Sequence, residues 1–227
     1  KPLVIEFYSV VNMNLSILAV FVILSVSYAV RYTTYEPIVE QLYFTGNDIR
    51  KNPTLLKDRV GGEEQKYVAS RDKSKNLEWS DGLARSCRDL VLDIGPFGLE
   101  GHSTSTGKDE RARAAIYTSS VSFLQETLVY NEIDDVAKSE REAMDVYELM
   151  MKNTKERDNL FNGAFTHVGI SCGCHASRVE VCCFAYGKDV INKRGVESMD
   201  VAMINPKTCD DSAKLSENLK VGANSKV

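Results

Sequence analysis

The 227-residue chain has no surplus of positive charge. Its 28 lysines and arginines are outnumbered by 32 acidic residues, so the formal net charge is -4 and the isoelectric point is near 5.5. Nucleic acids and anionic membrane surfaces are held mainly by clustered positive charge, and this chain has no such cluster. It also lacks a glycine-rich phosphate-binding loop and a strip of basic and aromatic residues. We therefore expect no nucleic-acid partner.

Internal repeats are absent as well. The composition, 43% hydrophobic and 26% charged, is typical of a globular protein with a core of ordinary size. The length is long for one domain and short for two. We expect one domain at residues 36–190, a polar C-terminal extension at 191–227, partly disordered, and an upstream segment at 1–29.

Charged residues are missing from Phe7 to Val30. Within this run, Leu15 to Val26 reads LSILAVFVILSV, which has the length of a signal-peptide hydrophobic region, and a small-x-small pattern ends at Ala29. We expect residues 1–29 to be an upstream extension plus a signal peptide, and the mature protein to be extracellular. An uncleaved transmembrane anchor and a buried core helix are the alternatives.

Six cysteines are present, and five of them follow residue 171. In an oxidising compartment cysteines pair first as disulfides. Residues 166–174 and 178–186 have the length and apolar character of strands, and a turn centred on Ser177 would place Cys172 opposite Cys182. We expect these two cysteines to form a disulfide. Three connectivities remain open for the other four cysteines, Cys87, Cys174, Cys183 and Cys209.

The same region also contains a dense set of soft metal ligands. It consists of Cys172, Cys174, His175, Cys182 and Cys183. Their spacing differs from the Cys-x2-Cys knuckles of structural zinc sites, so disulfides are favoured over zinc.

Three helices are marked by their ends and by apolar spacing. The first runs from Glu36-Pro37 to Asn52-Pro53, the second from an N-cap at Ser80 to Gly95-Pro96, and the third follows a capping box at residues 139–142. Residues 57–76 are expected to be a polar, lysine-rich connection. An apolar core segment is expected around residues 121–129. Helices beside a sheet-forming hairpin predict an α/β or α+β sandwich.

A Gly-x-Ser-x-Gly pattern occurs at residues 169–173. In hydrolases this serine sits on a strained turn between a strand and a helix. Here the pattern lies inside a predicted strand that leads into a hairpin, so Ser171 is interpreted as a strand residue. His167 is interpreted as a strand residue too, rather than as a general base.

Several segments, in this order and spacing, together resemble one protein family. They are Leu77–Ala84, Arg88-Asp89, Asp93–Pro96, Gly101–Ser103, Gly107, Asn159–Asn162, Val168–Gly173 and the strand with Cys182. Across residues 38–187 the chain resembles an SCP-like extracellular protein of the protist type, within the CAP superfamily of cysteine-rich secretory, antigen 5 and pathogenesis-related proteins. The resemblance implies secretion and an α/β fold, namely a three-layer α-β-α sandwich with a C-terminal antiparallel hairpin.

Members of this superfamily typically place two histidines and two glutamates in a surface cleft that can hold a divalent cation. The resemblance puts His102 and Glu126 at the first histidine and a glutamate, and Glu142 at the second glutamate. Glu156 stands where the second histidine is expected, so the set favours a hard cation such as calcium or magnesium over zinc. The alternatives are a solvated loop histidine, an exposed carboxylate at Glu126, and a capping role for Glu142 beside Ser139. No cofactor other than a divalent cation is implied.

Three functions follow from these expectations. The leading one is a secreted, non-enzymatic module that binds a lipid or sterol-like ligand, a cation or an extracellular protein. The second is a metal-assisted hydrolase or peptidase built on His102, Glu126 and Glu156. The third is a surface interaction protein, in contact with a membrane only if the N-terminal segment is uncleaved.

Overall fold

The computed structural model describes residues 38–131, 143–178 and 180–196. At its centre is a four-stranded sheet with the order β1-β4-β5-β3. Strand β5 is antiparallel to both β4 and β3, and β1 is parallel to β4. A separate antiparallel pair joins β2 and β6. The strands are β1 (Glu78–Trp79), β2 (Thr118–Ser120), β3 (Phe123–Asn131), β4 (His167–Cys174), β5 (Glu180–Lys188) and β6 (Ile191–Asn192).

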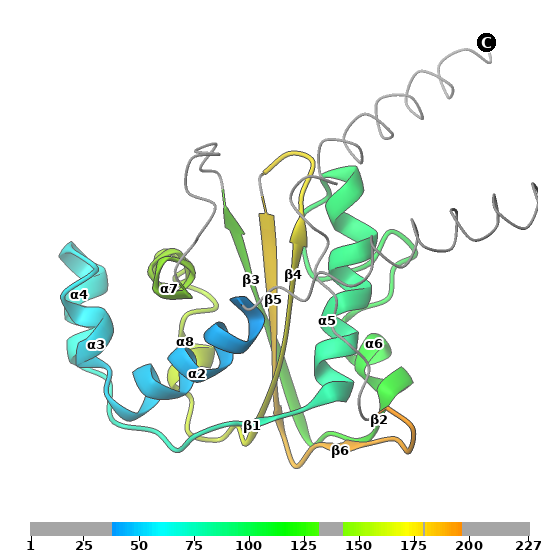
Figure 1. The fold of residues 1–227 in the computed structure, drawn as a ribbon, viewed down its shortest axis with the longest axis horizontal. Helices are drawn as coiled ribbons and strands as arrows, with labels where there is room; N and C mark the ends of the chain where they lie inside the picture. Colours follow the sequence, from blue (N-terminus) through cyan, green and yellow to red (C-terminus); the bar gives the residue numbers. More distant parts are fainter. Residues whose placement is uncertain (1–37, 132–142, 179, 197–227) are drawn as a thin grey trace, which may run out of the picture.

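Helices cover both faces of the central sheet (Figure 1). One layer contains α2 (Ile38–Lys51), α3 (Thr54–Lys57), α4 (Gly62–Ala69), α7 (Ala143–Lys152) and α8 (Asp158–Phe161). The other contains α5 (Asp81–Ile94), the short 3-10 helix η1 (Gly95–Phe97) and α6 (Glu110–Tyr117). Each layer has its own buried hydrophobic cluster against the sheet. The predicted three-layer α-β-α sandwich is therefore confirmed.

Helix α5 forms where the sequence predicted it. The Ser80 hydroxyl accepts a hydrogen bond from the Leu83 amide at 3.2 Å, which satisfies a free N–H group at the helix start. The apolar face is completely buried against β4 and β5. A Cβ atom at Gly169 of β4 would lie 2.0 Å from the Ala84 backbone nitrogen, so only glycine allows this close approach. Packing thus accounts for the first glycine of the Gly-x-Ser-x-Gly pattern.

The hairpin of β4 and β5 has the expected register. Cys172 pairs with Cys182, and the two sulfurs are bonded at 2.05 Å. Ser171 is a buried strand residue opposite Cys183, and no helix follows it before β5 begins. Ser171 therefore does not lie on the turn between a strand and a helix where the serine of such hydrolases lies.

Four of the described helices, α3, α4, α6 and α8, lie where the sequence did not predict them. Residues 57–76 were expected to be a connection without helix, and this is wrong because α4 occupies residues 62–69. Val68 is the one buried residue of α4, so the segment has no apolar periodicity. Helix α6 is similarly polar, with Arg113 and Ala114 as its buried residues.

Several expectations fall outside the described residues. They concern the signal peptide at residues 1–29, the capping box at 139–142 with Glu142, Cys209, and most of the extension at 191–227. Among the helices that the structure describes, none has both the length and the apolar character needed to span a bilayer.

Candidate functional site

The structure brings three of the four predicted cleft residues together. His102 lies in the loop between η1 and α6, Glu126 on β3, and Glu156 in the connection between α7 and α8. The imidazole Nδ1 is 3.0 Å from Oε1 of Glu126, and Nε2 is 3.0 Å from Oε1 of Glu156. The fourth predicted residue, Glu142, lies outside the described residues.

The second oxygen of each glutamate is also bonded. Arg113 of α6 donates from Nη2 to Oε2 of Glu126 at 2.5 Å, and the Leu128 amide donates to Oε2 of Glu156 at 2.7 Å. Arg113 is completely buried and donates further to the carbonyl groups of His102, Lys108 and Ser86. We refer to His102, Glu126, Glu156 and Arg113 as the His102 cluster.

The two carboxylates determine the protonation of His102. Its hydrogen bond to Glu126, and then that to Glu156, raise the imidazole pKa from 6.5 to about 10, although burial acts in the opposite direction. At neutral pH both ring nitrogens therefore carry a proton and donate. An imidazolium has no free lone pair, so His102 in this state serves neither as a general base nor as a metal ligand.

The arrangement does not fit the divalent cation that the family resemblance implies. A cation needs one atom from each ligand around a common point, but the two carboxylates contact opposite nitrogens of one ring. Within the described ranges, only two groups of three or more His, Cys, Asp and Glu side chains place their ligand atoms within 4.8 Å of one another, and His102 is in neither. Both groups contain cysteines that are already joined by disulfides.

The cysteines and the histidine that the sequence offered as soft metal ligands have other partners in the structure. Cys183 is bonded to Cys87 of α5 at 2.04 Å, which resolves one of the open connectivities, and no cysteine in the described part of the chain is free. His175 is buried, with Nε2 2.8 Å from the Leu99 carbonyl, and its Nδ1 accepts from the Arg178 amide. His167 contacts Glu78 at 3.6 Å near the surface.

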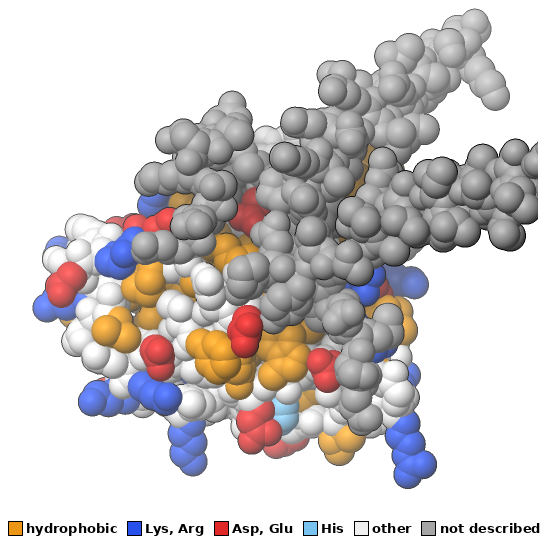
Figure 2. Space-filling model, viewed as in Figure 1, with side chains coloured by type: hydrophobic (Ala, Val, Ile, Leu, Met, Phe, Trp, Pro, Cys, Tyr) orange, Lys and Arg blue, Asp and Glu red, His pale blue; other side chains and the backbone are white. Residues whose placement is uncertain are grey.

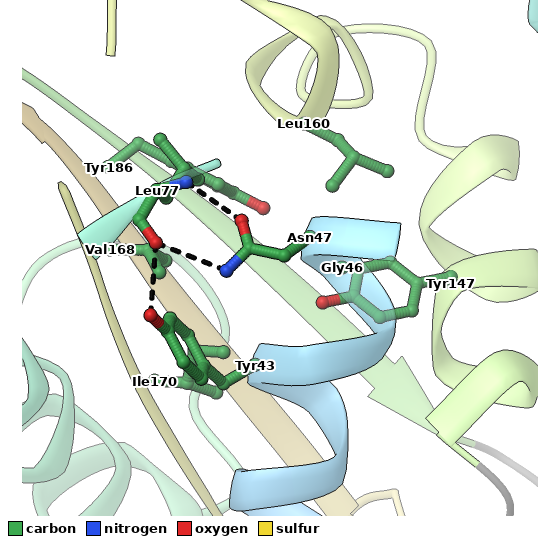
Figure 3. Close-up of a pocket in the computed structure, with 9 residues that line it drawn as sticks. All are labelled: Tyr43, Gly46, Asn47, Leu77, Tyr147, Leu160, Val168, Ile170 and Tyr186. Atoms are coloured by element: carbon green, nitrogen blue, oxygen red, sulfur yellow. Dashed lines mark hydrogen bonds between the residues drawn. The ribbon is translucent and has the colours of Figure 1, made fainter. Parts of the chain in front are cut away.

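A cavity lies between α2, α7 and the sheet (Figure 3). The cavity itself is small, about 10 Å³, which is enough for about one water molecule. Its walls are mainly aliphatic and aromatic. They are formed by Tyr43, Gly46, Asn47, Leu77, Tyr147, Leu160, Val168, Ile170 and Tyr186.

One polar group in the cavity wall has no partner. The Tyr186 side chain is buried, its hydroxyl makes no hydrogen bond within the described residues, and it points toward Asn47 and Leu160 (Figure 3). Burial raises the pKa of Tyr186, so the hydroxyl stays protonated at neutral pH. The Tyr147 hydroxyl, in contrast, donates to the Leu42 carbonyl at 2.6 Å. Buried polar groups without partners are rare, so the Tyr186 hydroxyl marks a position where a partner is missing.

An aromatic surface lies beside this cavity. Tyr43, which lines the cavity, stacks edge-to-face with Trp79 at 5.6 Å and contacts Phe44 at 5.3 Å. Phe44 is 56% exposed. Figure 2 shows apolar side chains gathered on this face over α2 and the neighbouring strands. We refer to Tyr43, Phe44 and Trp79 as the aromatic patch.

Sequence reasoning missed Arg113, Tyr186 and the aromatic patch. Arg113 lies in a helix without apolar periodicity, and Tyr186 reads as one more apolar residue of a buried strand. Phe44 did carry a usable indication, because it is a large apolar residue on the polar side of an otherwise amphipathic helix.

Two solved structures and one family model are similar to this chain. The solved structures similar to this chain include an outer surface protein from Borrelia burgdorferi, at 16% identity and a TM-score of 0.47, covering 67% of this chain and 93% of that one. An extracellular protein containing an SCP domain from Bacillus anthracis has 12% identity and a TM-score of 0.44, covering 67% of this chain and 40% of that one. No curated protein matches the sequence. The model of the cysteine-rich secretory protein family, CAP, matches residues 45–186, which is more than half of the chain. This chain therefore belongs to the CAP family of cysteine-rich secretory proteins.

Proposed function

We propose that this protein is an extracellular, non-enzymatic binding module that takes the polar end of a lipid or sterol-like ligand into the cavity between α2 and α7. The observation that carries the proposal is the unpartnered Tyr186 hydroxyl in a largely apolar cavity wall. Ligand sites are typically apolar clefts with a few polar groups that fix the ligand's orientation. A ligand hydroxyl or carboxyl group would supply the missing partner.

The size of the cavity limits how much of the ligand it takes. The space of about 10 Å³ is enough for about one water molecule, far below the roughly 300–1,000 Å³ of pockets that enclose a whole drug-sized ligand. A single hydroxyl or carboxyl oxygen at the end of a sterol or fatty acid matches a space of this size. The remaining apolar body would then lie over the aromatic patch, where Tyr43 and the exposed Phe44 offer apolar surface.

A nearby cation suits an oxygen-bearing end group. Arg50 of α2 is completely buried, and its Nη1 donates to the carbonyl of Leu160, a residue of the cavity wall. Its Nη2 has no partner among the described residues. The positive charge favours the negative end of a ligand dipole, or a carboxylate, in this part of the protein.

Action outside the cell is supported by three further features. The family is typically extracellular, disulfides persist in oxidising compartments, and residues 15–26 have the composition of a signal-peptide hydrophobic region. The His102 cluster supports a non-enzymatic role, because a glutamate carboxylate already contacts each ring nitrogen of His102.

Replacing Tyr186 with phenylalanine is expected to affect binding and stability in opposite directions. The Tyr186→Phe protein should be as stable as wild type or slightly more stable without ligand, because an unpaired buried hydroxyl is removed. Its affinity for the ligand should fall about 2- to 10-fold, the equivalent of one hydrogen bond of about 0.5–1.5 kcal/mol. Thermal melts and displacement of a fluorescent long-chain fatty acid and of a fluorescent sterol would measure both effects, and would show which ligand class binds.

Tyr147→Phe is the matched control, since Tyr147 lines the same cavity but its hydroxyl already donates to Leu42. It should lower stability by about 1 kcal/mol and leave affinity unchanged. The proposal is wrong if neither probe binds the wild-type protein, or if Tyr186→Phe binds both probes as tightly as wild type does.

A further inference from the structure

The His102 cluster spans the edge of the central sheet. Strand β3 is the last strand in the sheet order, with a helical layer on either side. The loop that carries His102 leads into α6 of one layer, whereas Glu156 lies between α7 and α8 of the other. One imidazole therefore connects, through two carboxylates, segments from both sides of the sheet.

The edge strand itself takes part in this connection. The Leu128 amide of β3 donates to the Glu156 carboxylate, and the Thr127 hydroxyl donates to the Glu156 carbonyl at 3.2 Å. Edge strands expose unpaired N–H groups that need a partner. Glu156 thus accepts a hydrogen bond from an edge N–H group of β3 and also bonds to His102.

All four carboxylate oxygens in the cluster are occupied by protein donors. Those of Glu126 accept from His102 and Arg113, and those of Glu156 accept from His102 and the Leu128 amide. A metal ion bound to either nitrogen of His102 would have to displace the carboxylate that now contacts that nitrogen. The displaced carboxylate oxygen would then lose this hydrogen bond, at a cost in free energy.

The charges of the cluster also disfavour a metal ion. The Arg113 guanidinium pairs with the Glu126 carboxylate, and both side chains are 1% exposed. A divalent cation at Glu126 would lie beside this guanidinium in a nearly water-free position. Uncompensated buried charge is strongly unfavourable.

We infer that the His102 cluster is a metal-independent latch, in which Glu156 bonds to the histidine and fastens the loop between η1 and α6 to the α7–α8 connection. At the position where the family resemblance expects a second histidine, this chain thus has a carboxylate that contacts Nε2 of His102. The latch is separate from the cavity beside Tyr186, and it stands whether or not that cavity binds a lipid.

The test uses the untagged full-length chain, so that no added histidines bind metal. Isothermal titration with zinc chloride and with calcium chloride should show no saturable binding, and neither EDTA nor either salt should change the melting temperature. Glu156→Gln and His102→Ala should each lower the melting temperature by about 2–4 °C or more. The double variant should lose clearly less than the sum of the two, because both substitutions break the same contact.

His167→Ala is the matched control, because His167 contacts a glutamate that is 82% exposed and should contribute little. Two results would overturn the inference. One is binding of one zinc or calcium ion that His102→Ala abolishes. The other is a melting temperature that Glu156→Gln and His102→Ala leave unchanged or lower additively.

Discussion

Replacing both Cys87 and Cys183 with alanine should lower the free energy of unfolding by about 4–5 kcal/mol, the largest effect of any change considered for this protein. Their disulfide joins residues 96 positions apart. In the chain-entropy view, a cross-link that closes a loop of about 100 residues stabilises by roughly 4.7 kcal/mol, because it restricts the unfolded chain. It also ties α5 directly to the middle of the sheet.

The Cys172–Cys182 disulfide provides the comparison. These residues are 10 positions apart, and the ladder of β4 and β5 already holds them opposite each other. Removing both should cost roughly 3 kcal/mol or less on the same scale. Urea unfolding of both double-alanine variants under non-reducing conditions gives the two values. Equal losses, or a larger loss for the Cys172 and Cys182 pair, would contradict this account.

Replacing Arg113 with methionine should destabilise the protein by about 3–5 kcal/mol. The substitution keeps a long side chain but removes the guanidinium from the buried Glu126 carboxylate and from three backbone carbonyl groups. A buried charge that loses its partner retains its full desolvation penalty, which is why the expected loss is large. Urea unfolding monitored by circular dichroism measures it.

Two further variants isolate the cause. Arg113→Met combined with Glu126→Gln should cost less than the sum of the separate changes, because the second removes the charge that the first leaves unpaired. Arg59→Met is the surface control, since Arg59 also bonds two carboxylates, of Asp145 and Glu148, but is 38% exposed. It should change stability by at most about 1 kcal/mol. Similar losses for the two arginines would contradict the assigned role of Arg113.

The fold could be predicted where local patterns and packing agree. The Ser80 cap, the buried face of α5 and the register of Cys172 with Cys182 all follow from residues close in sequence. Helices α4 and α6 could not be predicted in this way, because each buries only one or two residues and their stability depends on tertiary contacts.

The candidate site was predictable in part. His102, Glu126 and Glu156 could be named together from the family resemblance, and the structure places them within hydrogen-bonding distance. Their contact on opposite nitrogens of one ring depends on distances that a sequence pattern does not encode. Arg113 is a further example, because its partners are mostly backbone carbonyl groups, which every residue carries.

Tyr186 shows why the cavity could not be predicted. Its strand is a continuous buried run, so the residue reads as ordinary core. What distinguishes Tyr186 is that its hydroxyl has no partner among the described residues. Whether a partner is present depends on how side chains from α2, α7, α8 and β4 pack around the hydroxyl. A missing contact of this kind becomes visible only in three dimensions.

Native mass spectrometry of the protein tests the central claim most directly. If the cavity between α2 and α7 takes the end of a lipid or sterol-like ligand, wild-type protein should carry one such molecule, and Tyr186→Phe should carry markedly less. The released molecule should have a hydroxyl or carboxyl end group. Wild-type protein without any bound lipid, or equal occupancy in the two proteins, would contradict the account.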